Sequence, residues 1–313
     1  MKKQILIIVA LFIFASCGKE PEIEKTSLDS GLFFDQSIYT PEKYLVSASN
    51  PTPTSAEALK PVIIAIHGYG ATTFEWDEFR LFKGSRTDFS ISQVLLGGHG
   101  RDYQDFKNST WKDWQKPIIT EFEKLEKQGY KNISFAGSST ACTLILKLLA
   151  DSYFDNHIKP KHIFLIDPIV IPGNKTLSLV GVLGPIIGYT TVENTAGEEK
   201  FYFHYRPYET LQQLREIINE VRKDLEKGIS LPAGCTLKVL KSEKDDVADP
   251  VSAVLIYKGV KNSTGSPIEV EMISSDIHVF TRLNGRAPIL LATNIHITNQ
   301  SKAFTQIITT ILK

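Results

Sequence analysis

The amino-acid sequence predicts an α/β protein, with a mainly parallel sheet flanked by helices. Short apolar runs recur along the chain, helical patterns lie between most of them, and turn-forming residues bound them. The length of 313 residues suits one large α/β domain with insertions. The composition, 42% hydrophobic and 22% charged, is that of a globular protein. A formal net charge of zero argues against a nucleic-acid partner, which would require a basic surface.

The strands are predicted from continuous apolar runs, which are typical of strands buried on both faces. The first run, Val62–Ile66, is bounded by Pro61 and Gly68, and the later runs lie at 91–96, 133–136, 162–166, 237–240 and 268–273. Helices are expected at 114–128, directly after Ser139, around 254–259 and at 301–312. Strands that alternate with helices of this length predict parallel pairing with right-handed crossovers.

Residues 172–230 interrupt this alternation and predict a helical cap, inserted before the strand at 237–240. The insert contains an apolar, glycine-containing stretch at 177–189 and a polar patch at 193–200. An amphipathic helix with Leu214, Ile218 and Val221 on one face follows. An insert of this size usually covers a binding site. A helical pair with no gating role is the alternative interpretation.

The N-terminal segment predicts export and lipid attachment. Two lysines precede an apolar run, 5–15, that is too short to span a bilayer, as in a signal peptide. A buried N-terminal helix is the alternative. Phe14-Ala15-Ser16-Cys17 resembles a bacterial lipobox, in which Cys17 is lipidated and becomes the mature N-terminus. The prediction is therefore a signal peptide over 1–16, a lipid-bearing tether over 17–60 and a folded domain over 61–313.

This organisation places the protein in the bacterial cell envelope, attached to the lipid bilayer through the acylated Cys17. Lys19-Glu20 is similar to the surface-export signal of some outer-membrane lipoproteins, which favours the outer-membrane surface.

Ser139 is the predicted nucleophile. It follows a predicted strand, precedes a predicted helix and lies in the small-residue sequence Gly137-Ser138-Ser139-Thr140-Ala141. In such a strand–turn–helix context a tight turn lifts a serine hydroxyl above the carboxyl edge of the sheet. Ser139 is preferred to Ser138 because the glycine of the pattern lies two residues before the nucleophile. An ordinary serine-rich helix N-cap is the alternative.

The end of the first strand, Ile66-His67-Gly68-Tyr69-Gly70, predicts an oxyanion hole. Its glycines allow backbone N–H groups to turn toward a bound oxyanion, and the N–H groups of Tyr69 and Thr140 are the expected pair of donors. His67 is interpreted as a residue that braces the loop rather than as a catalytic base.

With these motifs the sequence resembles the α/β-hydrolase fold, and most closely the carboxylesterase and monoacylglycerol-lipase branch of the serine hydrolases. The resemblance covers about 60–313 and is strongest over 62–150. It rests on His67-Gly68, on Gly98-His99-Gly100 followed by Trp111-Lys112-Asp113-Trp114, and on Ala136–Ala141. It implies a triad whose members follow in the order serine, acid, histidine.

The acid and the base are expected in two late loops. Asp245, in the segment after the strand at 237–240, resembles the family's acid, with Asp246 and the earlier Asp167 as alternatives. His278, after the last predicted strand, resembles the family's histidine, and His296, just before the final helix, is its rival. A carboxylate at the acid position fixes the histidine tautomer and stabilises the imidazolium.

The resulting prediction is a carboxylic ester hydrolase that forms an acyl-enzyme on Ser139, with a small-molecule ester as substrate. No metal or organic cofactor is expected, since no Cys/His cluster has the spacing of a zinc site. The apolar part of the insert suggests an apolar acyl or aryl group in a short-chain or monoacyl ester. A thioesterase, a peptidase or a catalytically degenerate surface binding protein are the alternatives.

Overall fold

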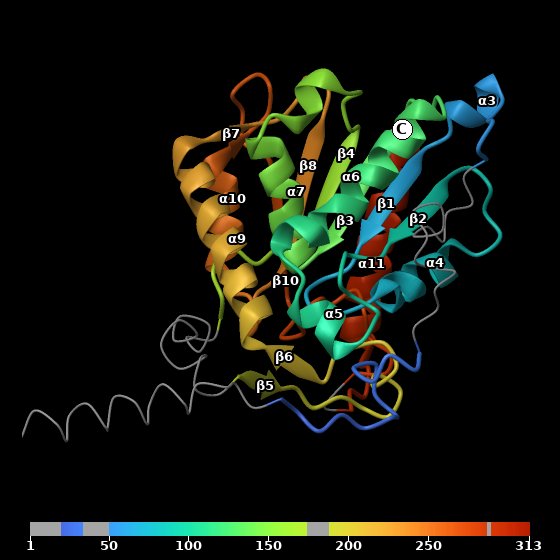
Figure 1. Ribbon diagram of the computed structural model, residues 1–313. Helices are drawn as coiled ribbons and strands as arrows, with labels where there is room; N and C mark the ends of the chain where they lie inside the picture. Colours follow the sequence, from blue (N-terminus) through green and yellow to red (C-terminus); the bar gives the residue numbers. More distant parts are fainter. Residues whose placement is uncertain (1–19, 34–49, 174–187, 287–288) are drawn as a thin grey trace, which may run out of the picture.

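The computed structural model describes residues 20–33, 50–173, 188–286 and 289–313 (Figure 1). Its centre is a parallel six-stranded sheet in the order β10-β8-β4-β3-β1-β2. The strands are β1 (Val62–Ile66), β2 (Ser90–Val94), β3 (Ile133–Ser138), β4 (His162–Ile166), β8 (Thr236–Ser242) and β10 (Glu269–Ile273). Each strand overlaps a predicted apolar run, and the predicted fold class is confirmed.

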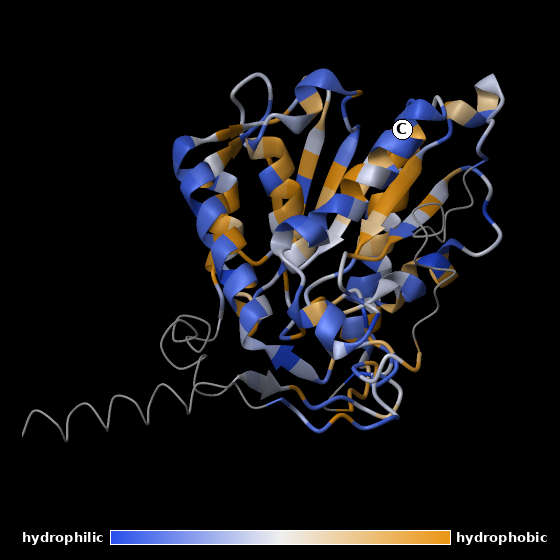
Figure 2. Cartoon of the chain, viewed as in Figure 1, coloured by the Kyte–Doolittle hydropathy of each residue, from blue (hydrophilic) through white to orange (hydrophobic). Residues whose placement is uncertain are grey.

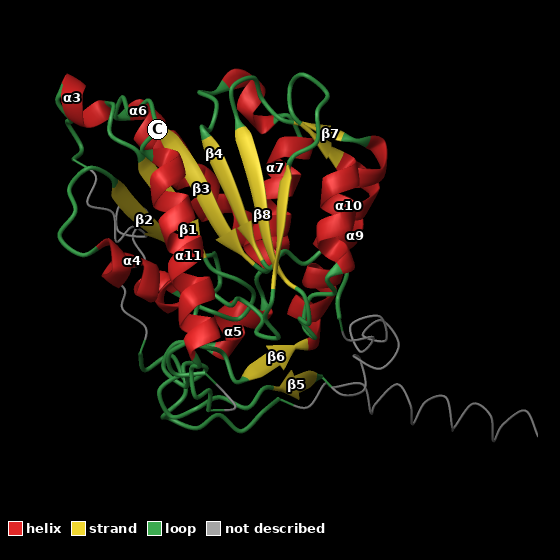
Figure 3. Ribbon diagram, turned by 180° about the vertical axis from the view of Figure 1, so that it is seen from behind, coloured by secondary structure: helices red, strands yellow, loops and turns green. Residues whose placement is uncertain are grey.

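Helices cover both faces of the sheet (Figures 1 and 3). One face carries α6 (Trp111–Lys127), α7 (Thr140–Ala150), α9 (Tyr208–Lys227) and α10 (Val251–Gly259). The other carries α4 (Asp77–Lys83) and α11 (Asn294–Ile311). Within β1, Ile64 and Ile66 belong to the first core whereas Ile63 and Ala65 belong to the second. Burial on both faces explains the apolar runs of the central strands. In Figure 2, β1 is mostly orange, whereas other strands show orange segments beside blue ones.

Shorter elements connect these layers. The described residues contain four further short helices: α3 (Ser55–Ala58), which precedes β1, and η1 (Thr73–Trp76), α5 (Tyr103–Lys107) and η2 (Tyr153–Asn156), which follow it. In the same part of the chain, two pairs of short strands lie outside the main sheet. The antiparallel pair is β5 (Tyr189–Thr191) with β6 (Tyr205–Pro207), and the parallel pair is β7 (Ile229–Ser230) with β9 (Val260–Lys261).

The predicted insert divides into two parts. Helix α9 packs its apolar stripe, which includes Ile217 and Val221, into the core shared with α7 and α10, so it belongs to a helical layer of the sheet. The β5–β6 hairpin lies beyond the carboxyl ends of the strands (Figure 1). Most of the apolar stretch at 177–189 lies outside the described residues.

The predicted signal peptide and Cys17 also lie outside the described residues. Residues 20–33, expected to be part of a tether, pack against the domain instead. Leu28 is buried with Phe106 and Phe203, and the Asp29 carboxylate accepts hydrogen bonds from backbone N–H groups of the segment that enters β6. Burial of one large apolar side chain and one carboxylate explains this difference. Among the described helices, none has the length and hydrophobicity of a membrane span.

Candidate active site

Ser139 occupies a strained turn between β3 and α7. Its φ of 51° and ψ of −116° place a non-glycine residue in a region that costs free energy. Its backbone N–H donates to the Ile166 carbonyl, at 2.9 Å, which ties the turn to β4. A Cβ at Gly137 would lie 2.7 Å from Ile145 Cδ1 and 3.2 Å from Ala141 Cβ. The small residues on both sides of the serine are therefore required by packing at this turn.

Three side chains predicted to act together lie in one hydrogen-bonded chain. His278 Nε2 is 2.8 Å from Ser139 Oγ, and His278 Nδ1 is 2.8 Å from Asp245 Oδ2. The second oxygen of Asp245 accepts from the N–H groups of Val247 (2.9 Å) and Ala248 (3.0 Å). The three residues follow β3, β8 and β10, and parallel strands bring their carboxyl ends to one edge of the sheet.

The rival residues lie elsewhere. Asp246 is exposed to solvent. His296 lies in the first turn of α11, where its ring is 3.9 Å from the Asp276 carboxylate. Asp167 is buried at the end of β4, behind Asp245, and its closest partners belong to β8 and to the loop that carries His278.

A buried lysine connects the two carboxylates behind His278. Lys241 is fully buried, and its Nζ donates to Asp245 Oδ2 and lies 3.4 Å from Asp167 Oδ1. Asp167 also accepts from the N–H groups of Ser242 (2.7 Å) and Phe280 (3.0 Å). Burial outweighs the attraction of Lys241 and raises the pKa of Asp167. For Asp245, burial acts in the same direction, but His278 and Lys241 together hold the pKa well below its usual range.

The loop after β1 lies directly against the serine. A Cβ at Gly68 would be 3.0 Å from Ser139 Cβ and 3.5 Å from its hydroxyl oxygen. The Gly68 N–H donates to Glu75 (2.8 Å), a buried carboxylate that also accepts from the Ser138 hydroxyl. In the described part of the chain, neither the Tyr69 N–H nor the Thr140 N–H has a hydrogen-bond acceptor. Thr140 begins α7, where a helix provides no internal acceptor.

His67 fixes the start of this loop. Its Nδ1 donates to the Gly68 carbonyl (2.8 Å), so its Nε2 is the acceptor for the Leu96 N–H (3.0 Å). Burial lowers the pKa of His67 to about 4, and the ring is therefore neutral near pH 7. Both ring nitrogens are used in the loop, in agreement with a bracing role.

The Ser139 hydroxyl and His278 face a cavity of about 320 Å³. Its walls come from the Gly68–Ala71 loop, from Leu214 of α9, from the β5–β6 hairpin and from the loop that follows His278. Much of the described lining is polar, including Arg206, Arg282, Arg286, Glu198 and Tyr202.

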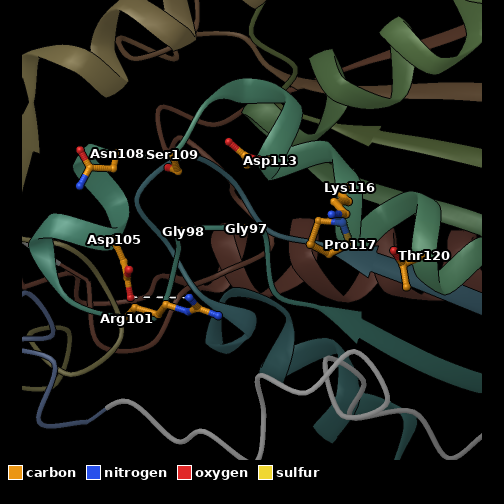
Figure 4. Close-up of a pocket in the computed structure, with 10 residues that line it drawn as sticks. All are labelled: Gly97, Gly98, Arg101, Asp105, Asn108, Ser109, Asp113, Lys116, Pro117 and Thr120. Atoms are coloured by element: carbon orange, nitrogen blue, oxygen red, sulfur yellow. Dashed lines mark ion pairs between the residues drawn. The ribbon is translucent and has the colours of Figure 1, made fainter.

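A second cavity, about 420 Å³, lies between the Gly97–Arg101 loop and α6 (Figure 4). Its lining contains none of the three residues of the hydrogen-bonded chain, and an Arg101–Asp105 ion pair (3.7 Å) crosses it. Within the described ranges, no group of three His, Cys, Asp or Glu side chains is arranged to hold a metal ion. Cys142 and Cys235 are buried free thiols.

Comparisons with known proteins give the same architecture. No protein-family model matches the chain. A carboxylesterase from Bacillus subtilis (strain 168) is 23% identical over 218 residues, which cover 67% of this chain and 82% of that enzyme. A thermostable monoacylglycerol lipase from Bacillus sp. (strain H-257) is 22% identical, covering 77% of this chain and 91% of the lipase. A solved structure from work on the metagenome-derived lipolytic enzymes LipS and LipT superimposes with a TM-score of 0.63 at 16% identity, covering 81% of this chain and 94% of that one.

The chain has the α/β-hydrolase fold. Three charged residues of this α/β-hydrolase site were not predicted from the sequence. Strand β8 contains two lysines, Lys238 and Lys241, and a charge inside a buried strand requires a partner, so the sequence carried a signal for Lys241 that did not distinguish it from Lys238. Glu75 and Arg206 lie in segments without a recognisable motif, and their partners are distant in the sequence.

Proposed function

We propose that this chain is a serine hydrolase that cleaves carboxylic esters through an acyl-enzyme on Ser139. The observation that carries the proposal is the chain of hydrogen bonds from Ser139 through His278 to Asp245, at a strained turn above the sheet. The carboxylesterase and the monoacylglycerol lipase that resemble the chain over most of their own length support esters as the substrate class.

In the proposed mechanism, His278 Nε2 accepts the Ser139 proton while the serine oxygen attacks the ester carbonyl. Asp245 holds the Nδ1–H tautomer and stabilises the imidazolium that forms. The N–H groups of Tyr69 and Thr140 receive the oxyanion of the tetrahedral intermediate. His278 then returns its proton to the departing alcohol, and a water molecule activated by the same ring hydrolyses the acyl-enzyme.

The proposed substrates are short esters. The cavity of about 320 Å³ is at the small end of the range for small-molecule sites and suits an acyl group of a few carbon atoms.

Labelling with a fluorophosphonate tests the nucleophile. The wild type and a Ser274→Ala variant, which alters an exposed serine in the loop before His278, should be labelled, whereas Ser139→Ala should not. Labelling that does not depend on Ser139, or no labelling of the wild type, would refute the proposal and favour a binding protein with a hydrolase fold.

Turnover tests the base and the substrate class. We expect His278→Ala to lose at least about 10³-fold in kcat for p-nitrophenyl butyrate, while His296→Ala retains wild-type turnover. The opposite pattern would reassign the base. Faster turnover of butyryl thioester or butyryl anilide than of the oxygen ester would indicate a thioesterase or an amidase instead.

We also propose that the mature chain is acylated at Cys17 and held to a membrane of the bacterial cell envelope. The lipobox-like sequence that ends at Cys17 supports this attachment. Cys17→Ser should abolish metabolic labelling with a fatty acid and release the protein from the membrane fraction. Labelling that persists in Cys17→Ser would refute the attachment.

A further inference from the structure

Arg206 places a cation in the wall of the cavity beside the predicted oxyanion donors. It lies in β6, and its guanidinium rests against Gly70, where a Cβ would overlap it. Its Nη1 lies 3.3 Å from the Gly70 carbonyl, and its Cζ is 5.3 Å from the centre of the Tyr69 ring. The guanidinium is therefore held on the loop that supplies one of the proposed oxyanion donors, and it faces the same cavity as Ser139.

The other two arginines of the cavity are engaged by the protein itself. Arg282 forms a buried ion pair with Glu198, and its guanidinium lies over the Tyr202 ring, 4.1 Å from the ring centre. Arg286 donates to the backbone carbonyls of His278 (2.7 Å) and Arg282 (2.9 Å), which fixes the loop after the histidine.

Arg206 is held less firmly than these two: like Arg286 it has no described carboxylate at ion-pair distance, and it also lacks the short hydrogen bonds to backbone carbonyls that Arg286 makes. Asp29 attracts it from further away, but the Asp29 oxygens accept from the N–H groups of His204 and Tyr205. Glu75 lines the same cavity, and its described hydrogen bonds come from the oxyanion loop and the Ser138 hydroxyl. Within the described chain, Arg206 makes one long hydrogen bond out of the five that a guanidinium can donate.

Arg206 is partly buried, and withdrawing a cation from water without a counter-ion costs free energy, which a bound anion can recover. A guanidinium that retains free donors in a small cavity matches the two oxygens of a carboxylate or phosphate. The described wall also carries other polar side chains, among them Asn194 and Glu198, and the β5–β6 hairpin appears in blue to white rather than orange in Figure 2. A wholly apolar ester would leave Arg206 without a partner.

From this geometry we infer that the ester substrate carries an anionic oxygen group, which Arg206 binds while the ester carbonyl lies at Ser139. The inference rests on the proposed function and narrows its substrate class. Because the cavity is small, the anion lies only a few bonds from the scissile carbonyl, as in a half-ester of a short dicarboxylic acid.

The test compares two p-nitrophenyl esters of similar size, the mono-ester of glutaric acid and the neutral hexanoate. We expect the wild type to favour the glutarate in kcat/KM by about 10-fold or more, since charge-assisted bidentate contacts discriminate at this level. Arg206→Gln and Arg206→Met should lower the ratio of kcat/KM for the glutarate to kcat/KM for the hexanoate by about 10- to 100-fold. Arg206→Lys should retain part of the preference for the glutarate. Arg222→Met, which removes an exposed arginine of α9, is the matched control and should keep the wild-type ratio.

The outcomes separate this inference from the proposed function. Hydrolysis of both esters with an unchanged ratio in Arg206→Gln and Arg206→Met, at wild-type thermal stability, would refute the anionic substrate and leave the esterase standing. No hydrolysis of either ester, together with no fluorophosphonate labelling, would refute the esterase itself. Inhibition of hexanoate turnover by monomethyl glutarate or by inorganic phosphate, lost in Arg206→Met, would identify the preferred anion. Inhibition by either anion that persists in Arg206→Met would count against the assignment.

Discussion

The buried lysine behind the triad gives the sharpest prediction. Lys241 and His278 both donate to Asp245 Oδ2, so the lysine cation partly neutralises the carboxylate that stabilises the imidazolium. Replacing Lys241 by Met removes this cation. Without the lysine, the Asp245 carboxylate attracts the imidazolium form of His278 more strongly. We therefore expect the acidic limb of the plot of kcat/KM against pH to move to higher pH.

The size of the shift follows from the shared oxygen. Two donors at hydrogen-bond length from one oxygen lie about 5 Å apart. At an effective dielectric constant of about 20, two unit charges at that separation repel by roughly 3 kcal/mol. Since about 1.4 kcal/mol corresponds to one pH unit, full loss of this repulsion amounts to about 2 units. Asp167, which also loses its partner and can take up a proton, reduces the expected shift to about 1–2 units.

The assay is hydrolysis of p-nitrophenyl butyrate between pH 5 and 9 under conditions that give kcat/KM, with thermal unfolding measured in parallel. Lys241→Gln is the second variant, because its neutral amide keeps a donor for the two carboxylates and protects the fold. Lys244→Met, an exposed lysine of the same loop, is the control for a loss of surface charge. An acidic limb that stays within about 0.3 units of the wild type in a folded Lys241→Met or Lys241→Gln protein would refute the electrostatic role.

Three further predictions concern stability and the oxyanion loop. Burial raises the pKa of Glu121 to about 7, above its unfolded value of 4.5, so its carboxyl group favours folding below about pH 4.5 and loses this contribution as pH rises through 7. Glu121→Gln should therefore raise the free energy of unfolding, measured by denaturant unfolding, by about 2–3 kcal/mol at pH 8 and by much less at pH 5. Equal effects at the two pH values would contradict this prediction. Gly68→Ala should lower kcat about 10- to 100-fold, because the added methyl group displaces Ser139. Gly197→Ala, where a Cβ has space, should leave kcat unchanged. Equal activity of the two variants would count against the close approach of Gly68 to Ser139. Leu28→Ala should cost about 2–3 kcal/mol in the same unfolding assay, and a loss below 0.5 kcal/mol would show that residues 20–33 do not pack on the domain in solution.

The fold could be predicted because burial on both faces makes the central strands β1 and β4 nearly continuous apolar runs, and the other strands carry enough apolar residues to be recognised between the helices. Ser139 was recognisable for a local reason, since a strained turn between strand and helix tolerates only small neighbours. Asp245 and His278 follow strands, and parallel pairing brings them to the edge that carries the serine.

The charged surroundings of the triad could not be predicted in the same way. Each of Lys241, Glu75 and Arg206 has a partner that is distant in the sequence: Asp167, the Ser138 hydroxyl and the Gly70 carbonyl, respectively. Polar, proline-containing sequence suggested a tether for the residues around Leu28, but a single apolar side chain with a place in the core outweighs that composition. Helix α9 has the amphipathic pattern of both a cap helix and a core helix, and packing alone decides between them.

The packing of residues 20–33 sets how far the domain can move from a membrane. Glu20 forms a 2.5 Å ion pair with Lys107, and the Glu22 carbonyl accepts from the hydroxyl of Tyr205, the first residue of β6. With Cys17 acylated as proposed, only Gly18 and Lys19 lie between the lipid-bearing residue and Glu20, and these three peptide steps reach about 10 Å at most. The segment between the lipid and the domain is therefore short, and it contacts the domain beside the β5–β6 hairpin that carries Arg206. We expect a domain held in this way to face the bilayer with the edge that carries Ser139, so that short esters reach its cavity through the thin layer of fluid beside the lipid.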